Sequence, residues 1–108
     1  MLSAKEMVKL ADSSIQNEHV AHIETIVKRH AENGKFFAKL WTGKPNSMDT
    51  QLIFIEQYNV DAYNHIQRMG YVFTSMQKPN GEVSLYIGWG FASEVALKIA
   101  IKAEAEEA

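Results

Sequence analysis

The chain has 108 residues, a formal net charge of −2 and no cysteine. This length predicts one domain over residues 1–108, and the 46% hydrophobic and 22% charged content is typical of a soluble globular protein. The charge gives no field that attracts nucleic acid or anionic membranes, the lack of cysteine excludes disulfides, and no apolar run approaches the ~20 residues of a membrane span. Because residues 1–6 also lack the pattern of a signal peptide, we expect the protein in the cytoplasm.

A long helix is predicted at the start of the chain. Ser3 and Glu6 fit a capping box, in which the serine hydroxyl bonds forward and the glutamate reaches back. Residues 12–14 (DSS) could divide this helix in two, because such side chains compete for backbone hydrogen bonds. Asn33 and Gly34 are typical of a helix C-terminus and are expected to end it. The apolar positions at helical spacing are Met7, Leu10, Ala11, Ile15, Val20, Ile23, Ile26, Val27 and Ala31.

Two strands are predicted next, near residues 36–41 and 51–57. The first segment (FFAKLW) is short and rich in aromatic residues, which favours a strand. The intervening residues 42–49 contain Gly43 and Pro45 and predict a loop. The second segment (QLIFIEQ) is bounded by polar residues and is interpreted as a strand, although its three consecutive apolar residues could instead open the following helix early.

A short helix is predicted over residues 60–69. Asn59 is a good N-cap, and Gly70 fits the left-handed position that follows a helix. Ala62, Ile66 and Met69 recur at helical spacing and form its apolar stripe. A helix of fewer than three turns is marginal alone, so we expect packing to stabilise it.

Residues 71–89 predict a β-hairpin, because polar and apolar side chains alternate on both sides of a turn. Pro79 has a negative φ, which excludes the type I′ turn of a two-residue hairpin. A type I turn at Pro79 and Asn80, followed by a left-handed Gly81, fits better. The expected pairs are Lys78 with Glu82, Ser75 with Leu85, Phe73 with Ile87 and Tyr71 with Trp89.

The alanine-rich segment 91–108 predicts a final helix, with Ser93 as its candidate N-cap. On a helical wheel, Val95 and Ile99 lie on one side, and Leu97 and Ile101 lie nearly opposite. A helix that is apolar over most of its girth is expected to be buried on two sides. In so small a domain, we assign the second side to another subunit. The predicted self-association residues are Val95, Leu97, Ile99 and Ile101.

The predicted order is therefore helix, strand, strand, helix, strand, strand, helix. This order is typical of an α+β domain, in which a small, mostly antiparallel sheet packs against helices. Its sheet would contain the hairpin 71–89 and the strands near 36–41 and 51–57.

Histidines offer two candidate sites for chemistry. His19 and His22 are spaced to approach one metal ion, but a zinc site needs three or four converging ligands, so a polar helix flank is the simpler interpretation. Asp61 and His65 are one helical turn apart and could form an acid–base pair, although such pairs are more often surface contacts. We predict no catalytic residue, metal site or cofactor, and Gly88-Trp89-Gly90 lacks the spacing of a phosphate-binding loop.

Alternating cations and aromatic residues on the strand near 36–41 suggest a second kind of site. Single-stranded nucleic acid binds to aromatic platforms flanked by positive charge. The alternative interpretation is a strand with one core face and one solvated face, and the net negative charge makes nucleic acid less favoured as a partner. The candidate nucleic-acid face consists of Lys35, Phe37, Lys39 and Trp41.

The pattern of turn and apolar residues resembles small uncharacterised accessory proteins of tailed bacteriophages. In these, a capped helix ending in an NGK sequence leads into a strand, and a later helix ends in a GY-V pattern before a hairpin closes on a tryptophan. The resemblance implies no known activity and assigns no functional residue. The matching residues are 3–6, Ile23, Ile26, Ala31, 33–35, 70–72 and Trp89.

The sequence thus favours a non-enzymatic, phage-type accessory protein that acts by binding another protein. It would be an inhibitor of a host factor or a minor virion or assembly component, located in the host cytoplasm and self-associating through its C-terminal helix. The alternative is a module that binds nucleic acid or a nucleotide, and a small metal-dependent enzyme is less favoured. The partner and the biological process are not encoded in any motif of the chain.

Overall fold

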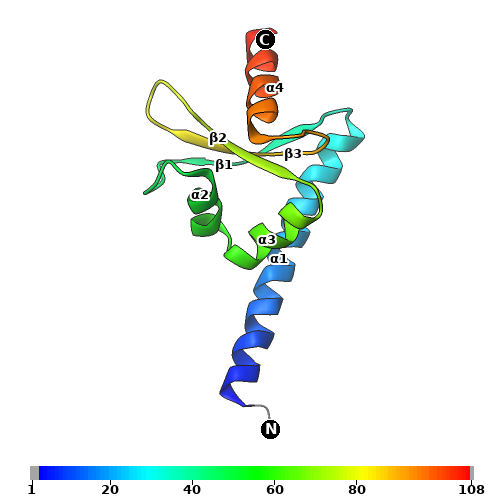
Figure 1. Ribbon diagram of the computed structural model, residues 1–108, viewed down its shortest axis with the longest axis vertical. Coiled ribbons are helices and arrows are strands. Elements are labelled where there is room, and N and C mark those ends of the chain that lie inside the picture. Colours follow the sequence, from blue (N-terminus) through cyan, green and yellow to red (C-terminus); the bar gives the residue numbers. More distant parts are fainter. Residues whose placement is uncertain (1–2, 108) are drawn as a thin grey trace.

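The computed structural model describes the backbone of residues 3–107 and the side chains of residues 3–7 and 18–105. Within these residues it is an α+β fold of four helices and one three-stranded antiparallel sheet. Figure 1 shows the elements in chain order. They are α1 (Ala4–Glu32), β1 (Phe37–Gly43), α2 (Thr50–Gln57), α3 (Val60–Arg68), β2 (Val72–Gln77), β3 (Val83–Gly88) and α4 (Glu94–Glu107).

The predicted hairpin is confirmed as β2 and β3. Phe73 pairs with Ile87 and Ser75 with Leu85, which is the expected register. At the turn, the Lys78 amide donates to the Glu82 carbonyl at 2.7 Å, and Gly81 adopts a φ of +90°. Turn chemistry and side-chain alternation therefore specify the same register, as they should in a stable hairpin.

Strand β1 pairs with the other side of β3, so the strand order is β1-β3-β2. The strand predicted near residues 36–41 is thus confirmed. One irregularity interrupts it: Lys39 pairs with Tyr86 but Trp41 pairs with Leu85, so Leu40 is an extra residue, a β-bulge. The bulge reverses the side-chain alternation after residue 39.

The strand predicted at residues 51–57 is wrong, because this segment is helix α2. The Asp49 side chain accepts a hydrogen bond from the Leu52 amide at 3.1 Å and caps the helix. Adjacent residues Ile53 and Phe54 are both fully buried on one side of α2, where the Phe54 ring contacts Phe73 at a centroid distance of 4.6 Å. The helix predicted at 60–69 is confirmed as α3, and α1 passes through residues 12–14 without a break.

The sheet separates two layers of unequal size (Figure 1). Helices α1, α2 and α3 lie on one face, and α4 lies on the other. Central strand β3 is buried on both faces. Because α1 and α4 extend away from the sheet in opposite directions, the molecule measures 58 × 32 × 21 Å. The main core between the sheet and the three helices contains Ile23, Val27, Ala38, Ile53, Phe54, Ala62, Tyr63, Ile66, Phe73, Val83, Leu85 and Ile87.

Candidate functional site

Helix α4 has one covered side and one open side. Leu97 and Ile101 are 0% and 6% exposed, and Leu97 packs on Gly88 of the same chain. Val95 and Ile99 lie on the opposite side of the helix and are 65% and 63% exposed. The expected two-sided apolar helix is present, but its own sheet covers one side. Leu97 and Ile101 are therefore not available for the predicted self-association. Of the four predicted residues, Val95 and Ile99 remain exposed.

An apolar groove adjoins this open side of α4. The groove has a volume of about 540 Å³ and lies between α4, the start of β1 and the turn after β3. Phe36 in its lining is exposed, and a salt bridge 3.2 Å long between Lys35 Nζ and Glu104 Oε1 joins two other lining residues. We call it the α4 groove. The side chains that give it its apolar character are Phe36, Phe37, Trp89, Phe91, Ala100 and Ala103.

The structure does not bring the four predicted nucleic-acid residues to one face. Phe37 and Lys39 precede the bulge and lie on the α4 side of the sheet, where the Phe37 ring contacts Tyr86 edge-on. Trp41 follows the bulge and packs against the main core on the opposite side. Lys35 is paired with Glu104, so the expected alternation of free cations and stacking rings is lost.

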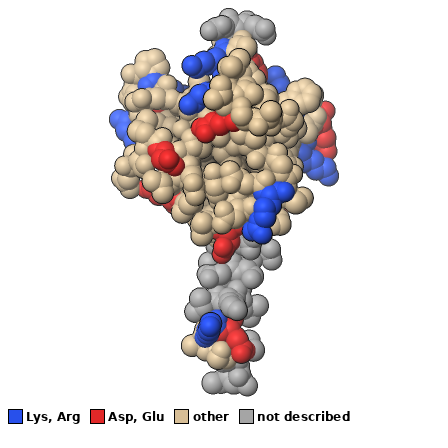
Figure 2. Space-filling view, viewed as in Figure 1, with Lys and Arg blue, Asp and Glu red and all other residues tan. Residues whose placement is uncertain are grey.

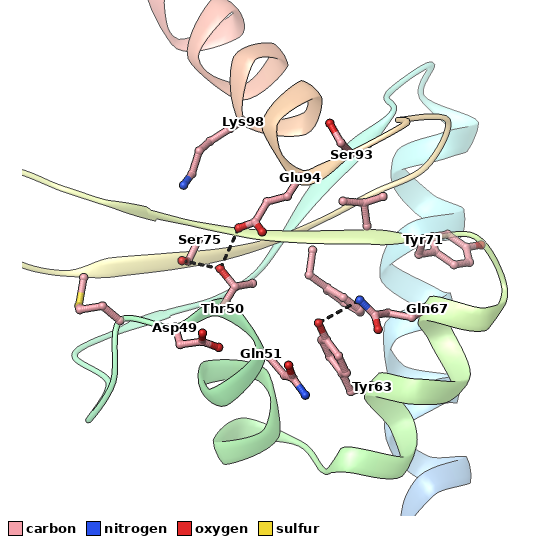
Figure 3. Close-up of a pocket in the computed structure, with 13 residues that line it drawn as sticks. Asp49, Thr50, Gln51, Tyr63, Gln67, Tyr71, Ser75, Ser93, Glu94 and Lys98 are labelled. Atoms are coloured by element: carbon pink, nitrogen blue, oxygen red, sulfur yellow. Dashed lines mark hydrogen bonds between the residues drawn. The ribbon is translucent and has the colours of Figure 1, made fainter.

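A second, polar cavity lies along the free edge of β2 (Figure 3). It has a volume of about 540 Å³. The start of α2 supplies Asp49, Thr50 and Gln51 on one side of the strand, and the start of α4 supplies Glu94 and Lys98 on the other. Charged side chains are sparse on the face of the molecule that contains this edge (Figure 2).

A chain of hydrogen bonds joins α4, β2 and α2 beside this cavity. Both Thr74 Oγ1 and Thr50 Oγ1 donate to Glu94 Oε1 at 3.1 Å. Because the Thr50 proton is used in this way, the Thr50 hydroxyl accepts from Ser75 Oγ at 2.9 Å. We call these four residues the Glu94 clasp. Its hydroxyls stabilise the carboxylate, and none of its described partners is a histidine that could act as a base toward Ser75.

Tyr63 lines the same cavity with its phenol held in place. Gln67 Nε2 donates to the Tyr63 hydroxyl at 2.9 Å. Burial raises the pKa of Tyr63, and the carboxylates of Glu94 and Asp49 raise it further, whereas the hydrogen bond from Gln67 lowers it. The phenol is therefore neutral near pH 7 and acts as a hydrogen-bonding group, not as a base.

The histidines do not converge on a metal site. The His19 ring contacts Tyr58 edge-on at 5.4 Å, whereas His22 is exposed. His65 lines a small cavity between α1 and α3 with Glu24. Among the residues that the structure describes, no three histidine or acidic side chains gather closely enough to hold an ion.

Sequence reasoning missed both cavities, although it found parts of each. Ser93 and the exposed residues of α4 were identified, but the lining of the α4 groove comes from three separate segments, two of which supply its aromatic residues. The cavity at β2 also depends on strand order, since β2 has a free edge only because β1 pairs with β3. The one available signal was the uncharged sequence of residues 72–77, which fits either an edge or a central strand.

The fold and these cavities define an α+β protein with one three-stranded sheet and two open surfaces. The chain matches no protein-family model, no curated protein and no solved structure. Within the described residues, no helix combines the length and the apolar character needed to cross a membrane.

Proposed function

We propose that this is a non-enzymatic binding protein that self-associates through the open side of α4. The observation that carries the proposal is the exposure of Val95 and Ile99, 65% and 63%, on the helix side opposite the buried Leu97. These two residues lie one turn apart, so they present one continuous aliphatic stripe. Soluble proteins rarely leave such a stripe beside an apolar groove without using it for contact.

A second copy of the chain is the occupant that fits best. Around Ile99 the open side carries small residues, Ala96, Ala100 and Ala103, which allow two helices to approach closely. An antiparallel pair of α4 helices related by a two-fold axis would bury the same stripe on both copies. Since a stable interface buries roughly 800 Å² per partner, the contact would extend into the α4 groove, where exposed Phe36 offers an aromatic anchor.

The clasp supports the non-enzymatic part of the proposal. Beside the polar cavity, the hydroxyls of Thr50, Thr74 and Ser75 and the carboxylate of Glu94 form one chain of hydrogen bonds. Such an arrangement stabilises the junction of two layers, and it engages the Glu94 carboxylate with two structural hydroxyls. The phage setting, either host-factor inhibition or a role in the virion, stays a prediction from the sequence pattern.

Light scattering coupled to size-exclusion chromatography tests self-association. We expect the wild-type protein to form a dimer and Val95→Glu/Ile99→Glu to be a monomer, because charge on the stripe would be buried in the interface. Met69→Glu is the matched control, since Met69 is equally exposed (66%) but lies at the end of α3, on the other side of the sheet. A wild-type monomer at high concentration, or a Met69→Glu variant that dissociates equally, would refute the proposal.

A further inference from the structure

We propose that the free edge of β2 binds an extended peptide in which acidic and apolar residues alternate. This site is separate from the open side of α4 and goes beyond the self-association proposed above. The peptide would add a fourth strand to the sheet, next to β2.

The hydrogen-bonding groups of this edge are defined by the hairpin register. Residue pairs in an antiparallel ladder alternate between hydrogen-bonded and non-hydrogen-bonded types. Because the Lys78 amide bonds to Glu82, the bonded pairs continue at Met76, Thr74 and Val72. The amide and carbonyl groups of the intervening residues therefore point away from β3, where no strand of the described chain pairs with them. These residues are Phe73, Ser75 and Gln77.

A groove follows the whole length of this edge. The polar cavity of about 540 Å³ adjoins a second cavity of about 340 Å³, and both are lined by Met48, Ser75 and Lys98. The first reaches Tyr71 and the second reaches Gln77, so together they run alongside all of β2. Strand β2 thus forms the floor between one bank from α4 and another from the start of α2 (Figure 3).

The two edges of the sheet differ in how they are protected. Bulges and lysines are the usual devices that prevent an edge strand from pairing with another chain. Strand β1 has both, in the bulge at Leu40 and the exposed Lys39. Strand β2 is regular over its six residues and contains no charged side chain. Its one obstacle is the Glu94 clasp, where the Thr50–Glu94 hydrogen bond must open for a strand to pair at Ser75.

The side chains on the two banks of the groove determine which peptide side chains fit it. Side chains of an added strand would point alternately toward α4 and toward α2. Lys98 and Lys102 lie one turn apart on the α4 bank, and neither forms a salt bridge with a described residue. The opposite bank offers the exposed Met48. These residues line the Gln77 end of the groove, where the described lining has no carboxylate, whereas Asp49 and Glu94 line the other end. Acidic residues on one side of the strand and apolar residues on the other therefore match the Gln77 end of the groove.

Fluorescence anisotropy with three kinds of labelled peptide tests this site. A short peptide of alternating glutamate and valine is expected to bind about tenfold more tightly than a lysine–valine peptide. Lys98→Glu/Lys102→Glu should reverse this preference, and both lysines lie at the surface, so the fold should persist. N-methylation of the alternate peptide amides that face β2 should abolish binding, whereas N-methylation of the other set should not.

Equal affinity for the two peptides, tolerance of N-methylation at both sets, or no binding would each overturn the proposal. If Lys98→Glu/Lys102→Glu stayed folded but did not change the peptide preference, these lysines would not contact the peptide and the assignment would be wrong. The neutral variant Val95→Gln/Ile99→Gln should still weaken self-association, because it places polar groups on the stripe. It should bind the glutamate–valine peptide as the wild type does, since it adds no charge beside Lys98 and Lys102, which lie three residues from the stripe positions. The two proposals can therefore fail independently.

Discussion

Gly88 is the residue that allows α4 to lie close to the sheet. A Cβ atom at this position would be 2.6 Å from Leu97 Cδ1 and 2.9 Å from Phe91 Cδ2, closer than nonbonded carbon atoms tolerate. Any larger residue would therefore push the start of α4 outward. The loss of contact would reach Glu94, whose hydrogen bonds join α4 to the other layer.

We expect Gly88→Ala to lower the free energy of unfolding by about 1–3 kcal/mol through overpacking. Leu97→Ala should cost about 2–5 kcal/mol, because it removes a fully buried side chain. Together the two changes should cost less than the sum, since the shortened residue 97 makes room for the new methyl group. Urea unfolding of the four proteins measures this coupling, and strict additivity would show that the two sites do not contact each other.

At the scale of single elements, α2 depends on its N-cap more than longer helices do. It has eight residues, and the Asp49 carboxylate satisfies the Leu52 amide at its first turn. We expect Asp49→Ala to lower the free energy of unfolding by about 1 kcal/mol, whereas Asp49→Asn should be nearly neutral because asparagine also caps well. Chemical denaturation compares the two variants, and equal losses would assign the effect to charge instead of the cap.

The elements that sequence analysis predicted correctly are those specified by local chemistry. In the hairpin, Pro79 and Gly81 restrict the turn, and alternation fixes the register. The helix predicted at 60–69 was likewise marked by Asn59. Segment 51–57 has a comparable N-cap in Asp49, but its three consecutive apolar residues fit a buried strand as well as a buried helix. The packing of Phe54 against Phe73 and Tyr63, which are distant in sequence, stabilises the helix.

The candidate surfaces were less predictable because they combine distant segments. Helical periodicity predicted an apolar girdle around α4, but only the tertiary structure shows that Leu97 and Ile101 are buried whereas Val95 and Ile99 are exposed. The β2 groove required the strand order and the positions of both helix starts, neither of which is local. The four residues of the proposed nucleic-acid face do not share one face, because the extra residue at Leu40 turns Trp41 to the core side, and Lys35 is paired with Glu104.

For the whole molecule, tyrosine ionisation links stability to alkaline pH. Burial raises the pKa of Tyr58, Tyr63 and Tyr86 above the ordinary value of 10.0, and these residues belong to both layers. In the unfolded chain their phenols ionise first, so proton release favours unfolding above pH 10. The stabilisation is therefore complete below pH 10 and is lost as the pH rises through the higher folded-state values.

We expect ionisation of these three tyrosines to leave the free energy of unfolding unchanged up to about pH 10 and to lower it above that pH. Tyr58→Phe removes one of the three ionisable groups and should make the decline shallower. Urea unfolding of both proteins at a series of alkaline pH values measures the slope. A wild-type stability that rises above pH 10, or an identical slope in the variant, would contradict this linkage.

The bulge in β1 shifts the side-chain alternation of this strand by one residue. Every side chain after Leu40 occupies the face that its predecessor would have taken in a regular strand. Deletion of Leu40 would leave the Trp41 indole on the core side, because Trp41 would then follow Lys39 directly and still pair with Leu85. If Leu40 instead stayed and paired with Leu85, the indole would turn to the side of Phe37 and Lys39 and leave a hole in the main core. The one extra residue therefore decides on which side of the sheet the rest of β1 places its side chains.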